Sequence, residues 1–198
     1  MSKTITLAVS DETFKLMKKF PEVNFSELAR QRINDYLSKL EEKQSPESLE
    51  FLVLKDLIFS SERIKEIHNL VEKNKKQMNE LDWVNSVFDL DLFDSLARFL
   101  KEFARIHPFE DGNKRTAFIC TDSFFRLNRM KLRISQFAKK TTDDEKFFWQ
   151  NANQQKTEKQ IKEFIKEHII ESRKPQSVEQ AISESVAENK ILLKNLAQ

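Results

Sequence analysis

The chain has 198 residues, which is the size of one ordinary domain or of one domain with a small appendage. Hydrophobic residues make up 39% of it and charged residues 33%, and its 17 phenylalanines exclude a disordered polymer. The net charge of +2 indicates no particular partner, and the sequence has no apolar secretory or membrane-spanning run. Cys120 is its one cysteine, which excludes an intramolecular disulfide and a cysteine-based zinc site. We therefore expect a folded, soluble protein of the cytoplasm without membrane contact.

Glycine is almost absent from the sequence. Gly112 is its one glycine, where an average usage of about 7% would give about 14. Every motif that needs two glycines is therefore excluded, including the Walker A loop, the Rossmann fingerprint and the glycine-rich loop of protein kinases. Few glycines and four prolines also leave few turns, so the composition predicts a mainly all-α fold.

The first residues of the chain predict one strand followed by two helices. Residues 4–9 alternate polar or small with apolar side chains, which is the period of a half-buried strand. Ser10 is predicted to begin the first helix, and Asn24 or Ser26 the second. Because one strand cannot satisfy its backbone alone, we expect it to pair with a second copy of the chain in a homodimer.

From residue 47 onward the spacing of apolar residues predicts helix after helix. These helices cover about 47–58, 61–77, 91–106, 113–128, 143–153, 157–171 and 177–195. Linkers at 44–47 and 173–176 divide the chain into a small module over residues 1–44, a helical domain over 47–172 and a C-terminal amphipathic helix in 177–198. We expect that last helix to dock on the body of the protein or on a partner.

The loop HPFEDGNKR, just before the predicted helix 113–128, has the residues of an anion site. Gly112 allows a close backbone approach, and a helix that begins after it turns free N–H groups and the positive end of its dipole toward an anion. Lys114 and Arg115 add a point charge and a fork of donors for phosphate oxygens. Residues 97–133 carry nine basic against four acidic side chains, so the positive charge is concentrated here.

Three more side chains of this loop suit phosphate chemistry. Asp111 is a hard oxygen ligand of the kind Mg²⁺ prefers. His107, four residues earlier, is a residue type suited to take a proton from an attacking hydroxyl near neutral pH. Phe109 is expected to anchor the loop in the core. Each residue alone would fit a plain surface corner between helices, but their combination favours a phosphate site.

The same loop, with DLFDSLARFLKEFARI before it and FFRLNRMKL after it, resembles the motif of the Fic/Doc family, and its Doc (death-on-curing) branch in particular. The resemblance implies the Fic/Doc-type helical bundle and an enzyme that uses ATP and Mg²⁺. By this resemblance His107 is the general base, Phe109 a structural anchor and Asp111 the magnesium residue. The implied phosphate site consists of Gly112, Asn113, Lys114 and Arg115, of which Arg115 is also catalytic.

Lys114 and Phe118 stand where AMP-transferring Fic enzymes have a glycine and a second arginine. Both differences match Doc, whose members transfer the terminal phosphate of ATP to a hydroxyl of elongation factor Tu. The resemblance therefore implies a toxin kinase of that type, with an antitoxin as a partner. A Fic-type AMP or nucleotidyl transferase and a non-catalytic regulator that binds operator DNA remain as alternatives. The family's acceptor-clamping hairpin is not evident, and residues 82–89 are its candidate replacement.

The N-terminal module resembles the ribbon-helix-helix family of DNA-binding domains in its order of strand, helix and helix. By that resemblance Thr4 and Thr6 read the major groove of an operator with Lys3 beside them, and Asn24 and Ser26 lie near a phosphate. Such a module would dimerise the chain and allow autoregulation. A dimerising role without DNA is the alternative.

Other residues are predicted to be structural. His68 and His168 lack a second metal-ligating partner at helical spacing, and Cys120 lacks a neighbouring base. The run EKNKKQMNE at residues 72–80 is predicted to be a solvated face.

Overall fold

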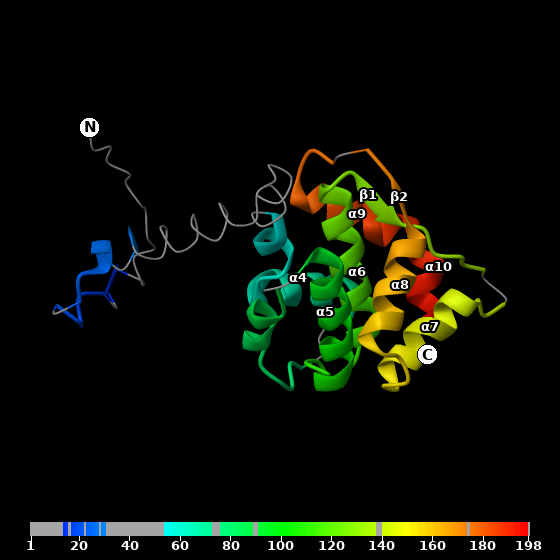
Figure 1. Ribbon diagram of the computed structural model, residues 1–198, viewed down its shortest axis with the longest axis horizontal. Coiled ribbons are helices and arrows are strands. Elements are labelled where there is room, and N and C mark those ends of the chain that lie inside the picture. The colour runs from blue at the N-terminus through cyan, green and yellow to red at the C-terminus, as the bar shows by residue number, and fades with distance from the viewer. Residues whose placement is uncertain are drawn as a thin grey trace. The chain divides into compact units, whose positions relative to one another are not determined.

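Two compact units, Met1–Leu49 and Glu50–Gln198, make up the computed structural model of the chain (Figure 1). The structure describes residues 14–15, 17–21, 23–27, 29–30, 54–72, 76–88, 91–137, 140–173 and 175–197. Among these residues, no helix has both the length and the apolar character needed to cross a membrane.

Helical turns form the described part of the first unit. Residues 14, 15 and 17 are helical, and so are residues 25–27 and 29–30. Asn24 caps the second of these segments, because its Oδ1 accepts a hydrogen bond of 3.0 Å from the N–H of Glu27. The predicted strand at 4–9, the Ser10 cap and the candidate DNA-binding residues Lys3, Thr4 and Thr6 lie outside the described residues.

The second unit is mainly helical, as the composition predicts. After a helical stretch at 54–58, its first elements are α4 (Ser61–Val71), the 3₁₀-helix η1 (Asp82–Phe88), α5 (Leu92–Ile106) and α6 (Asn113–Leu127). The later elements are β1 (Met130–Leu132), α7 (Asp143–Ala152), α8 (Glu158–His168), β2 (Ile169–Glu171), α9 (Val178–Glu188) and α10 (Lys190–Asn195).

Five helices in this unit begin where the sequence provides a side-chain cap. The side-chain oxygens of Ser60, Asp91 and Ser177 accept N–H groups from the first turns of α4, α5 and α9. Thr142 and Thr157 form complete capping boxes at α7 and α8. This chemistry is local, which explains why five helix starts lie close to their predicted positions.

The differences from the predicted elements arise at helix ends. The helix predicted over 157–171 stops at His168, because the chain becomes extended and β2 pairs antiparallel with β1, with Lys131 opposite Ile170. Strands of three residues are too short to show an alternating pattern. The helix predicted over 61–77 stops at Val71, and Asn189 separates α9 from α10 within 177–195.

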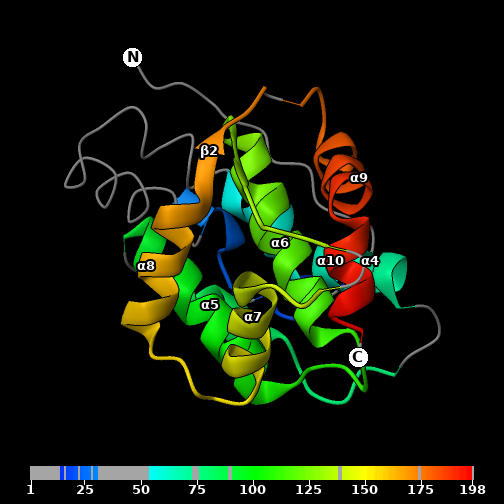
Figure 2. The same cartoon turned by 90° about the vertical axis from the view of Figure 1, so that its right-hand side faces the viewer.

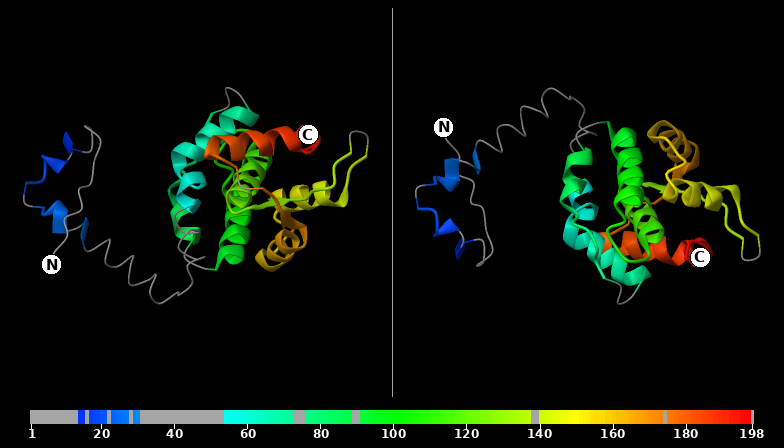
Figure 3. Two further views of the ribbon diagram at one scale, coloured as in Figure 1. Left: turned by 90° about the horizontal axis from the view of Figure 1, so that it is seen from above. Right: turned by 90° about the horizontal axis from the view of Figure 1, so that it is seen from below.

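α6 is the central helix of the unit. Figure 2 shows α6 between α5 and α8 on one side and α4 and α9 on the other, and α6 contacts α4, α5, α7 and α9. The views from above and below show α4 and α7 on opposite sides of the central helices (Figure 3). Fourteen residues of α6 are buried, with Phe118, Phe124 and Phe125 at 0% exposure. The loop that leads into α6 is therefore attached to a rigid element.

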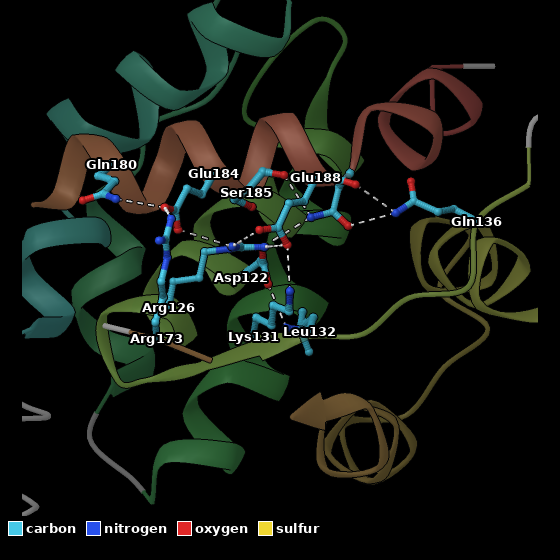
Figure 4. Close-up of polar contacts among 11 residues, drawn as sticks. Asp122, Arg126, Lys131, Leu132, Gln136, Arg173, Gln180, Glu184, Ser185 and Glu188 are labelled. Atoms are coloured by element: carbon cyan, nitrogen blue, oxygen red, sulfur yellow. Dashed lines mark hydrogen bonds and ion pairs between the residues drawn. The ribbon is translucent and has the colours of Figure 1, made fainter. Parts of the chain in front are cut away.

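Arg126, near the end of α6, fastens α9 to the body through a buried ion-pair network (Figure 4). Its side chain is 1% exposed, its Nε donates to Asp122 at 2.8 Å, and its Nη2 donates to Glu188 at 2.9 Å. Bonds from Arg126 and Lys131 hold the pKa of Glu188 at about 2. Asp122 also accepts the N–H of Leu132 at 2.8 Å, so one carboxylate joins α6, α9 and β1. The C-terminal helix thus docks on the body of this unit.

Candidate functional site

The turn between α5 and α6 presents His107 to solvent. His107 is the C-cap of α5 with a left-handed backbone (φ 48°, ψ 65°), and its N–H donates to the carbonyl of Phe103 at 3.2 Å. A residue with a side chain is uncommon in this conformation, which usually belongs to glycine at helix ends. The imidazole is exposed, as is required of a base that takes a proton from a second molecule.

Phe109 and Asn113 lock the loop from within. Phe109 is 3% exposed, and the Asn113 side chain is part of the same buried layer. The N–H of Phe109 donates to Oδ1 of Asn113 at 3.0 Å, and its carbonyl accepts from Nδ2 of Asn113 at 2.7 Å. The side-chain amide of Asn113 is therefore engaged inside the protein, and its main-chain N–H at the start of α6 is the group that remains for a phosphate.

Gly112 leads into α6 with a left-handed backbone (φ 75°) and is packed against α4. A Cβ atom at this position would lie 2.9 Å from Cβ of Glu72 and 3.1 Å from Cε1 of His68. Both the conformation and the surroundings therefore require glycine. No side chain caps the first turn of α6, so its N–H groups are available to an anion.

His68 is buried directly beneath this loop, at 1% exposure. Its ring stacks on Phe109 with the centroids 3.7 Å apart, and its Nδ1 lies 3.1 Å from Oγ1 of Thr116. Because the Thr116 hydroxyl donates its hydrogen to the carbonyl of Gly112, Nδ1 of His68 is the donor in that contact. Burial lowers the pKa of His68 below its ordinary value of 6.5, which keeps the ring neutral. His68 is a structural residue, as predicted, and it supports the loop from below through Phe109 and Thr116.

The last turn of α4 holds Arg115. Its Nη1 donates to the carbonyl of Val71 at 2.7 Å, and its Nη2 donates to Oε2 of Glu72 at 2.6 Å and lies 3.6 Å from the carboxylate of Asp111. The Arg115 side chain is 9% exposed. The guanidinium that the motif assigns to phosphate already has a carboxylate partner, and a phosphate would have to replace it.

Asp111 is the candidate metal residue. Its side chain is 53% exposed at the start of α6, and its Oδ1 accepts the N–H of Gly112. No group of three or more His, Cys, Asp or Glu side chains suited to a metal occurs within the described parts of the chain. Mg²⁺ in phosphate-transfer sites is commonly held by one or two carboxylates together with phosphate oxygens, so a single open carboxylate fits this ion.

A small hollow between α5, α6 and α7 brings His107 beside Lys114. Apolar side chains such as Phe103 and Phe148 line most of it, and Asn151 contributes a polar edge. Its volume is about 20 Å³, enough for about one water molecule. A nucleotide would therefore lie over the hollow and against the loop, with its phosphates near Lys114, rather than inside it.

Residues 76–79 run antiparallel beside the loop, where the sequence predicts only a solvated face. Gln77 bridges Phe109, and the N–H of Met78 donates to the carbonyl of Pro108 at 2.7 Å. The segment is exposed but bonded to the loop along its length, whereas residues 82–88 form η1 against α5. Neither this segment nor Glu72 and His68 is identified by the motif, because each reaches the loop from an element distant in sequence.

The fold and this site define a helical protein with the loop 107–112 between two core helices, α5 and α6. The model of the Fic/DOC family matches residues 20–125, which is just over half of the chain and includes the loop, α4 and α5. The chain belongs to the Fic/DOC family. Members of this family are typically transferases that modify proteins by AMPylation or phosphorylation, and they generally use ATP and a divalent metal. Comparisons with curated proteins and with solved structures found no match.

Proposed function

We propose that the chain is a toxin-type kinase of the Doc branch, which transfers the γ-phosphate of ATP to a hydroxyl of a translation factor of the elongation factor Tu type. The observation that carries this proposal is the pair formed by Lys114, beside His107 at the hollow, and Phe118, buried in the core. AMP-transferring relatives have a glycine and a second arginine at these positions. Here the loop offers a lysine and one arginine, Arg115, which matches Doc.

The phosphates of ATP are proposed to lie on the N–H groups of the first turn of α6, near Lys114, with Arg115 exchanging Glu72 for a phosphate oxygen. Asp111 would hold Mg²⁺, which neutralises charge on the phosphates when it is bound. The imidazole of His107 takes the proton of the acceptor hydroxyl. The hydroxyl oxygen bonds to the γ-phosphorus, the bond from that phosphorus to the β–γ bridging oxygen breaks, and ADP leaves with the electron pair.

The test is transfer of label from ATP carrying it at either the α or the γ position, with purified elongation factor Tu and a cell extract as acceptors. Label from the γ position on the acceptor is the expected result. In His107→Ala transfer should fall by about 10²- to 10⁴-fold, the usual contribution of a positioned base. Transfer of α label alone would identify a nucleotidyl transferase. No transfer of either label would favour the regulator without catalysis.

We also propose that residues 1–44 form a ribbon-helix-helix module, which makes the chain a homodimer and binds operator DNA. An antitoxin would then bind the second unit. The Asn24 cap and the unit boundary at Leu49 support a separate helical module. Light scattering and DNA binding should be compared between the full chain and a chain that starts at Glu50. The same number of chains per particle in both would contradict dimerisation through the module.

A further inference from the structure

One side chain outside the motif, Asn79, bonds to the turn that carries His107. Its Nδ2 donates to the carbonyl of Ile106 at 2.8 Å and to the carbonyl of His107 at 3.2 Å. Its main-chain N–H donates to the carbonyl of Pro108 at 3.2 Å. Three consecutive carbonyls of the turn thus share one partner.

These bonds act on the two torsions of His107. The carbonyl of Ile106 belongs to the peptide plane before the His107 Cα, and the carbonyl of His107 belongs to the plane after it. Fixing the first plane fixes φ, and fixing the second fixes ψ. His107 has the left-handed values φ 48° and ψ 65°, which a residue with a side chain rarely adopts without support. The amide of Asn79 supplies that support, since it also bonds carbonyls that a helix end leaves without partners.

Asn79 is itself held in place before any ligand binds. Nε2 of Gln77 donates to the carbonyl of Asn79 at 2.9 Å. In the residues just before Asn79, Met78 donates to the Pro108 carbonyl at 2.7 Å, and the carbonyl of Lys76 accepts from the N–H of Glu110 at 2.9 Å. The amide therefore lies in a fixed register with the loop, and little entropy is lost when it holds the turn.

We infer that Asn79 is a positioning residue for His107: it fixes the backbone from which the imidazole reaches the acceptor hydroxyl. The consequence for catalysis rests on the proposed function, whereas the effect on His107 itself does not. Removing the amide should release φ and ψ of His107 without changing the loop residues proposed to bind phosphate. The chemical step should therefore slow, while the affinity for ATP should stay the same.

The first experiment needs no activity. The chain has three histidines, so its labelled imidazole spectrum is simple, and the His107 signals are those that vanish in His107→Ala. Asn79→Ala should move the His107 signals and leave those of His168 in place. Met78→Ala is the matched control, because its exposed side chain lies in the same segment, and it should move neither. Unmoved His107 signals in Asn79→Ala would overturn the inference even if the chain transferred nothing.

The second experiment uses the labelled-ATP assay. Asn79→Ala should lower kcat by about 10- to 100-fold with KM for ATP within about twofold, because misplacing a reacting group by about 1 Å has effects of this size. In a His107→Ala background it should cost nothing further, since the two residues act as one unit. Asn79→Asp keeps the volume of the side chain but replaces the donating NH₂ by an oxygen that cannot donate to the carbonyls, so it should behave like Asn79→Ala. It is the variant to use if Asn79→Ala lowers the melting temperature. An additive loss in the double variant, or a raised KM with unchanged kcat, would sink the idea.

Discussion

Glu72 accepts a hydrogen bond of 2.6 Å from Nη2 of Arg115, and this bond joins the last turn of α4 to the first turn of α6. The two residues are 43 positions apart in sequence. A carboxylate on the arginine of a phosphate site competes with phosphate for the same donors. A phosphate that bound Arg115 as proposed would therefore have to displace Glu72.

Glu72→Gln should bind ATP more tightly. The amide keeps the shape of the side chain but removes the charge that competes with phosphate, so we expect Kd for ATP to fall by on the order of tenfold, or about 1.4 kcal/mol. Calorimetric titration with ATP and Mg²⁺ measures this without any acceptor. Glu66→Gln is the matched control, because Glu66 lies in α4, the helix that Glu72 ends, is 62% exposed and pairs with Arg63. A variant at Glu72 that binds ATP no better than wild type would contradict the competition.

Gly112→Ala should destabilise the second unit. The new Cβ would meet Glu72 at 2.9 Å and His68 at 3.1 Å, and φ of 75° is unfavourable for alanine. We expect a loss of about 1–3 kcal/mol in the free energy of unfolding, measured in urea without ligand. Glu110→Ala, at an exposed position of the same loop, should change it by less than about 0.5 kcal/mol. Equal losses in the two variants would show that the left-handed turn tolerates a side chain.

Phe118→Arg should not create a second phosphate-binding arginine. Phe118 is 0% exposed and packs edge-on against Phe148, with ring centroids 5.5 Å apart, so a charge there should cost several kcal/mol and unfold the domain. Lys114→Gly is the usable variant for changing the transferred group, because Lys114 is only partly buried. It should stay folded and shift label transfer from the γ toward the α phosphate. A folded Phe118→Arg protein, seen by circular dichroism and melting, would refute the core assignment.

Glu188 should make the stability of the protein depend on pH in acid. Its pKa is about 2 in the folded state against an ordinary 4.5, because Arg126 and Lys131 bond to it. A depressed pKa contributes stability that is fully present above about 4.5 and is lost as the pH falls toward about 2. Glu188→Gln should therefore melt earlier than wild type at pH 7, and the difference should shrink below pH 4.5.

Melting curves of both proteins from neutral to acid pH measure this difference. Glu163→Gln, on the exposed side of α8, provides the comparison and should show no such convergence. A constant difference between wild type and Glu188→Gln at every pH would mean that packing, and not the ion pair, is what the substitution removes.

Local chemistry explains how much of the fold the sequence predicts. The helix predicted over 91–106 is Leu92–Ile106, because Asp91 caps it and its apolar stripe is wide. The helix predicted over 113–128 is Asn113–Leu127, because Gly112 precedes it. The short strands could not be predicted, since their pairing across the fold, and not a pattern within the segment, stabilises them. The 3₁₀-helix η1 could not be predicted either, because it is held by packing against α5.

Some residues of the candidate site could likewise be predicted from the sequence, and others could not. The motif identifies the loop from His107 to Arg115. It does not identify Glu72 or Asn79, because these lie in a run of charged and amide residues that looks like any solvated face. Long-range partners of this kind leave no periodic signal, and only the packing of α4 and residues 76–79 against the loop reveals them.

The buried Arg126 has a consequence for how the protein is made. Glu188 leaves the ribosome 62 residues after Arg126, or about 3 to 12 s later at about 5–20 residues per second. Before α9 is made, Asp122 is the one carboxylate paired with the guanidinium among the described residues, because its other partners, Glu184 and Glu188, both lie on α9. A partly compensated charge in the core disfavours the packed state by several kcal/mol. We therefore expect α6 to become fixed only once α9 has been synthesised. Fragments that end before α9 should therefore be degraded rather than folded.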